Sequence, residues 1–158
     1  SNLGIPSQLQ SAQSSATYTP FVVSGARNVA LVFSGTNDIA ANATAAAVEA
    51  TTQALCVALK SGGFQRIVVA TMLPRTGGLS GGQTTGGFET ARLAYNTWLR
   101  ANWTTFADAL ADFGGDAVMG DVANIANTTY YADTIHPTSV GHAILAKIAA
   151  IAFNAVSA

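Results

Sequence analysis

Two short and almost unbroken apolar runs constrain the fold of this chain more than any other feature. They cover residues 28–34 (NVALVFS) and 66–71 (RIVVAT). Runs of this length and composition are typical of strands that are covered on both faces of a parallel sheet. Between them, apolar side chains recur at helical spacing over residues 44–60, and Ser-Gly-Gly at 61–63 is a helix stop signal. The sequence therefore predicts a strand, a crossover helix and a second parallel strand.

The second half of the chain continues this alternation. A Gly-rich loop is expected over residues 76–87, and a last short strand over residues 117–119. Two further helices are indicated by apolar side chains at helical spacing, Phe88, Ala91, Tyr95 and Leu99 for the first and Val140, Ile144, Ile148 and Ile151 for the closing one. The order β-α-β-α-β-α predicts one α/β domain over residues 1–158. In such a domain, ligand sites lie beyond the carboxyl ends of the strands.

The composition narrows the classes of partner. Of the 158 residues, 7 are Lys or Arg and 8 are Asp or Glu, which gives a formal net charge of -1. This balance disfavours binding to nucleic acid or to an anionic membrane surface. The sequence has no stretch of about 18 consecutive apolar residues, so no membrane-spanning helix is expected. Low charge with many hydroxyl and amide side chains favours an extracellular or periplasmic protein.

The few groups able to catalyse reactions at neutral pH can be considered one by one. The single cysteine, Cys56, lies between apolar neighbours and is expected to be an inert buried thiol. Trp98 and Trp103 are expected to be core residues. His142 falls in the first turn of the closing helix, where a structural role is expected, and its spacing from His136 across Pro137 does not favour a metal site.

His136 is the stronger candidate for a general base. It follows Asp133 by three residues, and Pro137 favours an extended backbone at this point, so the two side chains can approach each other in a turn. A carboxylate bound to one imidazole nitrogen leaves the other free to accept a proton from a nucleophile. The alternative is that Asp133 only holds the loop and His136 is an ordinary surface residue.

Two further groups could stabilise negative charge. Asn37 ends the first strand in Gly-Thr-Asn-Asp, where its amide can donate a hydrogen bond, although the same tetrapeptide also suits a simple turn. Gly4, in Asn-Leu-Gly-Ile-Pro, can offer a backbone N–H.

The order of these motifs resembles the SGNH hydrolases, also called GDSL esterases and lipases. Asn-Leu-Gly-Ile-Pro, Gly-Thr-Asn-Asp and Asp-x-x-His-Pro follow one another over nearly the whole chain. The resemblance implies that Gly4 and Asn37 form an oxyanion hole, that His136 is the base and that Asp133 orients it. It also implies a three-layer α/β/α fold with a flavodoxin-like parallel sheet.

The chain departs from the family pattern at the nucleophile. The family's serine belongs to a Gly-Asp-Ser block before the glycine block, and this sequence has no Gly-Asp-Ser. The resemblance therefore implies that an N-terminal strand and helix are missing here, which would leave residues 29–33 with an unpaired edge. We expect a separate N-terminal segment or a second chain to complete the sheet and to supply the serine.

The resemblance implies a serine-dependent ester hydrolase that works through an acyl-enzyme, of the esterase, lipase or carbohydrate deacetylase type. The expected substrate is a small ester or an acetylated carbohydrate, and no metal or organic cofactor is implied. Two alternatives stay open at this point. One is a non-catalytic carbohydrate-binding domain of the same shape, and the other is an acetyltransferase with the same triad.

Overall fold

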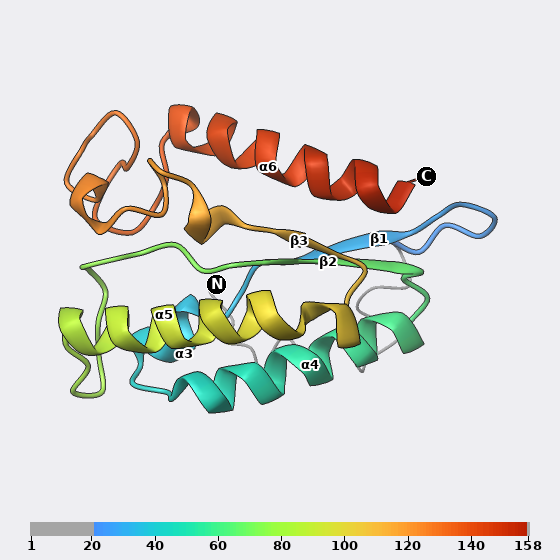
Figure 1. Cartoon of the computed structure of the whole chain (residues 1–158), viewed down its shortest axis with the longest axis horizontal. Coiled ribbons are helices and arrows are strands. Elements are labelled where there is room, and N and C mark those ends of the chain that lie inside the picture. The colour runs from blue at the N-terminus through green and yellow to red at the C-terminus, as the bar shows by residue number, and fades with distance from the viewer. Residues whose placement is uncertain (1–20, 158) are drawn as a thin grey trace.

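The computed structural model describes residues 21–157, and its centre is a parallel sheet of three strands. Strands β1 (Val29–Val32), β2 (Arg66–Ala70) and β3 (Ala109–Ala111) lie in the order β1-β2-β3. Helix α6 (Ser139–Ser157) covers one face of the sheet, and the other α-helices of the described residues lie on the opposite face (Figure 1). The prediction of an α/β fold with a parallel sheet is confirmed.

Three helices form the layer opposite α6, namely α3 (Thr36–Ala40), α4 (Ala45–Ser61) and α5 (Thr85–Asn102). Helix α4 begins where the hydroxyl of Thr44 accepts a hydrogen bond from the N–H of Ala47. Helix α5 begins in the same way, because the Thr84 hydroxyl accepts from the N–H of Gly87. The predicted loop over residues 76–87 therefore ends earlier than expected, since this cap starts the helix at Thr85. Short 3-10 helices cover Trp103–Thr105, Phe113–Gly115 and Val122–Asn124.

Strand β2 is the most buried element, and its side chains alternate between two apolar clusters. Ile67 and Val69 face the cluster formed with α4 and α5, whereas Val68 and Ala70 face the cluster formed with α6. Cys56 lies in the first cluster, where burial raises the pKa of its thiol to about 12, as expected for an inert core residue. Trp98 stacks on Phe106 beside the same cluster, also as expected for a core residue.

The third strand is not where the sequence pattern placed it. Residues 117–119 form a turn, because one carboxylate oxygen of Asp116 accepts from the N–H groups of Val118 and Met119. The strand is instead Ala109–Ala111, whose two alanines are buried. Alanine gives a weak strand signal in a sequence, so the equally short Ala-Val-Met segment with its β-branched valine attracted the prediction.

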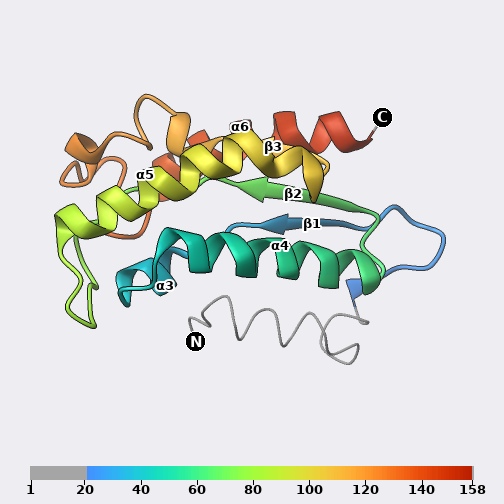
Figure 2. The same cartoon turned by 60° about the horizontal axis from the view of Figure 1, so that its bottom comes forward.

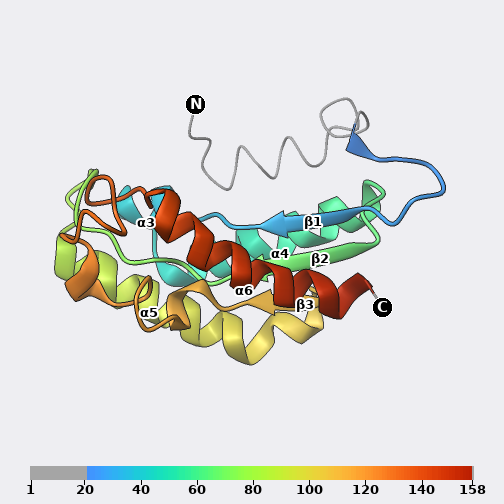
Figure 3. The ribbon, with the colours of Figure 1, turned by 90° about the horizontal axis from the view of Figure 1, so that it is seen from above.

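The closing helix is present, but its predicted apolar stripe is only partly buried. Helix α6 buries Gly141, Leu145, Ala152 and Val156, and partly buried Ile144 and Ile148 pack beside them. Val140 and Ile151 are exposed, Ile151 by 73%. By length and composition alone this helix could cross a membrane, contrary to the expectation of no such segment, and 22% of it is buried. Its contacts with β3 show that it covers the sheet (Figure 3).

Strand β1 is an edge strand, because within the described residues it pairs with β2 alone (Figure 2). The prediction that its apolar run is covered on both faces is wrong for this part of the chain, since Leu31 and Phe33 are 40% and 43% exposed. Both side chains line an apolar groove of about 350 Å³ between β1 and α6. The other residues that line this groove are Phe113, His142, Leu145, Ala146 and Ala149. We call it the β1–α6 groove.

Candidate active site

Asp133 and His136 form a hydrogen-bonded pair in the loop before α6. The carboxylate oxygen Oδ2 of Asp133 lies 2.8 Å from Nδ1 of His136. The other oxygen, Oδ1, accepts from the backbone N–H groups of Ile135 and His136, each at 2.7 Å. The hydrogen bond from the His136 ring, followed by these backbone bonds, lowers the pKa of Asp133 from its ordinary value of 3.8 to about 2. The carboxylate is therefore charged at neutral pH and leaves Nε2 as the nitrogen that can accept a proton.

The loop that carries this pair is held at both ends. Tyr131 is buried, and its hydroxyl donates to the carbonyl of Met119 over 2.6 Å. A short antiparallel bridge joins Tyr131 to Pro137, and the N–H of Ala132 donates to the carbonyl of His136. These contacts leave the pair itself in solvent, with 63% of the His136 side chain and 53% of the Asp133 side chain exposed.

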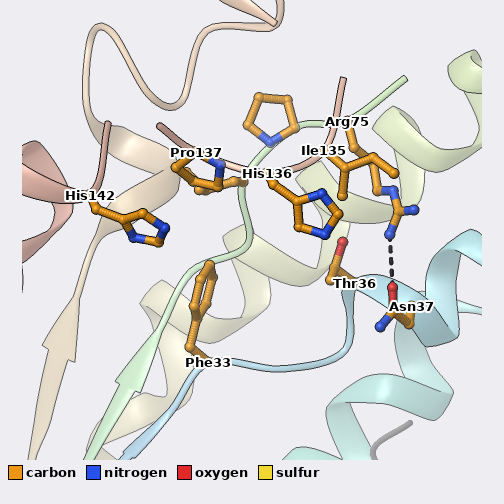
Figure 4. Close-up of a pocket in the computed structure, with 10 residues that line it drawn as sticks. Phe33, Thr36, Asn37, Arg75, Ile135, His136, Pro137 and His142 are labelled. Carbon is orange, nitrogen blue, oxygen red and sulfur yellow. Dashed lines mark hydrogen bonds between the residues drawn. The ribbon is translucent and has the colours of Figure 1, made fainter. Parts of the chain in front are cut away.

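His136 lines a pocket at the carboxyl ends of β1 and β2 (Figure 4). The pocket has a volume of about 250 Å³, which suits a small ligand group. Its lining residues are Phe33, Thr36, Asn37, Leu73, Pro74, Arg75, Ile135, His136, Pro137 and His142. This is the edge of the sheet at which the sequence pattern predicted a site.

Asn37 reaches the pocket from the first turn of α3. The turn is possible because Gly35, which precedes the helix, has a φ of 92°, a value that favours glycine. The side-chain oxygen Oδ1 of Asn37 accepts a hydrogen bond of 2.9 Å from Nη1 of Arg75. Its Nδ2 group is thus the part of the amide that can donate to a ligand.

Arg75 follows β2 and holds the loop next to the pocket. Arg75 is 4% exposed, and its guanidinium donates to the carbonyls of Gly77 and Gly78 as well as to Asn37. Burial lowers the pKa of this guanidinium, and the charge of Asp133 opposes that effect. The same loop is joined to the Asp133–His136 loop, because the N–H of Thr76 donates to the carbonyl of Thr134. The loop after β2 is therefore hydrogen-bonded to both of the other segments that surround the pocket, the one with Asn37 and the one with His136.

The structure brings His136, Asp133 and Asn37 to one place, and it adds residues that the sequence argument left out. Gly4, the other predicted oxyanion donor, lies outside the described residues. Arg75 and Thr36 were not considered, although both lie in the loops just after predicted strands, two residues beyond residue 34 for Thr36 and four beyond residue 71 for Arg75. That position could have found them. His142 was expected to be structural, but it is exposed and lines both the pocket and the β1–α6 groove.

Thr36 bears the single hydroxyl among the described residues that line the pocket. Its oxygen is directed toward the His136 ring (Figure 4). Within the described structure, however, no hydrogen bond joins the two side chains.

Comparison of the sequence with known protein families identifies the family to which this site belongs. The model of the GDSL-like lipase/acylhydrolase family matches residues 2–144. The chain belongs to this family. The match spans the segments that contain Asn37, Asp133 and His136, so the resemblance seen in the motifs is confirmed. No curated protein matches the chain.

Membership of the GDSL-like lipase/acylhydrolase family supports hydrolase activity on acyl esters in general. The exposed imidazole and the neighbouring amide are groups that such chemistry can use, since one can move a proton and the other can bind a negatively charged oxygen. Among residues 21–157, no group of three or more His, Cys, Asp or Glu side chains is arranged to hold a metal ion.

Proposed function

We propose that this chain forms the base and oxyanion side of a serine ester hydrolase that acts through an acyl-enzyme. The observation that carries the proposal is the bond between Asp133 and Nδ1 of His136 at the rim of a pocket that Asn37 also lines. A charged carboxylate on Nδ1 fixes the tautomer in which Nε2 is the proton acceptor, and it stabilises the imidazolium that follows. The family assignment supports the same chemistry at the coarser level of acyl hydrolysis.

The reaction balances with these groups. A serine Oγ attacks the ester carbonyl carbon while Nε2 of His136 accepts the hydroxyl proton, and Nδ2 of Asn37 donates to the negative oxygen that forms. The ester C–O bond then breaks, and His136 returns the proton to the departing alcohol. Water repeats the sequence on the acyl-serine and releases the carboxylic acid and the free serine. The backbone N–H of Gly4 is the second proposed donor to the oxyanion.

We propose that the serine comes from an extended segment outside this sequence that pairs with β1. No serine is among the described residues that line the pocket. The edge of β1 pairs with no other described strand and can accept such a segment. The β1–α6 groove offers apolar cover for its side chains, with no Lys, Arg, Asp or Glu among the described lining residues. In a parallel orientation the residue after this added strand emerges at the same edge as Asn37, beside the pocket.

The substrate class follows from the pocket. A volume of about 250 Å³ and a lining dominated by Phe33, Leu73, Pro74 and Ile135 suit a short acyl group such as acetyl. The open rim at His136 can accommodate an alcohol of larger size, including a sugar. We also propose an extracellular or periplasmic location, in keeping with the low content of charged residues.

The nucleophile is tested by labelling with a fluorophosphonate, which reacts with activated serines. We expect no labelling of this chain alone, and labelling of the added segment when the two are combined or expressed as one protein. Labelling of this chain alone would overturn an external serine. Loss of that labelling in Thr36→Val would then identify Thr36 as the nucleophile.

The base is tested by hydrolysis of p-nitrophenyl acetate by the combined protein. His136→Ala is expected to lower kcat by about 10²- to 10⁴-fold, because the serine then has no proton acceptor. Lys147→Ala, on an exposed position of α6, serves as the control and should leave the rate unchanged. Equal rates for the wild type and His136→Ala would remove His136 from the mechanism and overturn the proposed function.

A further inference from the structure

We infer that Arg75 is a positioning residue, which fixes and polarises the Asn37 amide so that its N–H group serves the oxyanion. The inference rests on the proposed function and extends it to a residue outside the family motifs identified in the sequence. The observation behind it is the 2.9 Å hydrogen bond from Nη1 of Arg75 to Oδ1 of Asn37, next to the pocket (Figure 4).

The chemistry of the guanidinium decides which way the Asn37 amide points. A guanidinium has five N–H donors and no acceptor, so the amide atom that faces it must be the oxygen. The NH₂ group is then held on the opposite branch of the amide. Without Arg75, the two branches differ little in size and the amide can rotate between them, which would present an acceptor to the oxyanion for part of the time.

Charge adds to this orientation. A cation bound to an amide oxygen draws electron density from the nitrogen and makes its N–H a stronger donor. Arg75 is well placed to do this because it is 4% exposed, so water screens its charge poorly. None of the ion pairs found among the described residues includes Arg75. Its positive charge is therefore not neutralised by a contacting carboxylate in this part of the chain.

The surrounding loop holds the guanidinium in position. Nε donates to the carbonyl of Gly77 at 2.9 Å, and Nη2 donates to the carbonyl of Gly78 at 3.1 Å. The ring of Phe88 lies 5.9 Å from the guanidinium carbon and covers it from α5. Three acceptors and an aromatic face thus determine the position of a side chain that would otherwise have several rotatable bonds.

A double-mutant cycle on the combined protein tests the inference with p-nitrophenyl acetate. Asn37→Ala is expected to lower kcat by about 10²- to 10³-fold, the usual effect of losing an oxyanion donor. Arg75→Met should lower kcat by about 10- to 10²-fold with KM changed by less than about threefold, because positioning acts on the transition state. In the Asn37→Ala background, Arg75→Met should have no further effect on kcat, since the group it positions is absent.

A general loss of structure gives a different result. Arg75→Met would then slow the reaction by the same factor with or without Asn37, and the inference would be wrong. Arg92→Met is the matched control, because Arg92 is also buried but bonds to Glu89 and Met72. It should lower the melting temperature and leave kcat unchanged. If Arg75→Met does not fold, Arg75→Lys replaces it, because it keeps the charge but cannot reach all three acceptors.

The outcomes separate this inference from the proposed function. Loss of activity in His136→Ala, together with an unchanged kcat in both Arg75 variants, would overturn the role of Arg75 and leave the hydrolase intact. An unchanged rate in His136→Ala would overturn the hydrolase itself.

Discussion

The carboxylate of Asp133 has two tasks, and they use different oxygens. Oδ1 binds two backbone N–H groups and shapes the turn, while Oδ2 binds the His136 ring. The turn would persist with an asparagine at this position, because an amide oxygen can accept the same two hydrogen bonds. The charge is what an asparagine cannot supply, so the two tasks can be separated by one substitution.

The stability of the protein should reveal this charge in acid. The pKa of Asp133 is lowered to about 2, so its ionised form is favoured by folding. The resulting stabilisation is complete above the ordinary value of 3.8 and is lost as the pH falls toward the folded value. Asp133→Asn lacks this contribution at every pH. We expect the urea midpoint of the wild type to exceed that of Asp133→Asn near pH 5 and the difference to shrink toward pH 2.

The control for this titration is Asp121→Asn, which removes an exposed carboxylate that caps a short 3-10 helix. Because acid lowers the stability of every variant, the urea midpoint of each variant is reported as its difference from the wild type at the same pH. The difference for Asp133→Asn is then compared with that for Asp121→Asn. A gap between the wild type and Asp133→Asn that stays constant over this pH range would contradict the assignment of the charge.

At the scale of elements, the loop after β2 connects the parts of the candidate site. Arg75 contacts Asn37 on one side, and Thr76 contacts Thr134 on the other. Gly78 allows this arrangement, because its φ is +63° and a side chain there would collide with the Arg75 guanidinium. The segment after β2 therefore decides how the segments after β1 and before α6 sit relative to each other.

Gly78→Ala and Gly82→Ala form a matched pair that tests this role of the loop. Both glycines have left-handed φ angles, +63° and +83°, but a side chain at Gly82 meets nothing within 4 Å. Each substitution should cost about 1 kcal/mol of stability from backbone strain. Only Gly78→Ala should also lower kcat of the combined protein, since it displaces Arg75.

The measurements are the unfolding free energy in urea and the rate on p-nitrophenyl acetate. If the two variants lose activity to the same degree, strain alone explains the effect and the contact with Arg75 has no part in it.

At the scale of the whole molecule, the main structural feature is the edge of β1 that pairs with no other strand among residues 21–157. The exposed apolar residues Leu31 and Phe33 lie on β1 and just after it, and both line the β1–α6 groove. Exposed apolar surface that runs along a free strand edge suits pairing with another strand. The same surface makes self-association the expected behaviour of the chain when it is isolated.

Leu31→Glu tests the proposed pairing. A charge in the groove should weaken binding of the serine-bearing segment by at least about 10-fold, because the carboxylate would lose water without gaining a partner. The fold of this chain should tolerate the change, since Leu31 is 40% exposed. Val57→Glu, at a 59% exposed position of α4 away from the groove, is the control and should bind the segment normally. Binding is measured by calorimetry, and equal affinities for the two variants would place the segment elsewhere.

The local features of this protein could be predicted from its sequence. The apolar runs of β1 and β2, the capped helix between them and the turn that joins Asp133 to His136 all depend on residues close together in the chain. The position of Asn37 at a strand end also follows from the pattern of a parallel sheet. The buried face of α6 was predicted less well, because its regular Ala and Ile content does not show which side meets the sheet.

Other features were decided by tertiary structure alone. Arg75 and Asn37 are 38 residues apart, and no spacing rule connects them until β1 and β2 pair and bring their ends together. The strand Ala109–Ala111 is recognisable only by its pairing with β2, because alanine has little strand preference of its own. The sequence alone determined which chemical groups are available and how near neighbours such as Asp133 and His136 meet, because these contacts depend only on short-range geometry. The long-range packing of three loops decided which of those groups can act together.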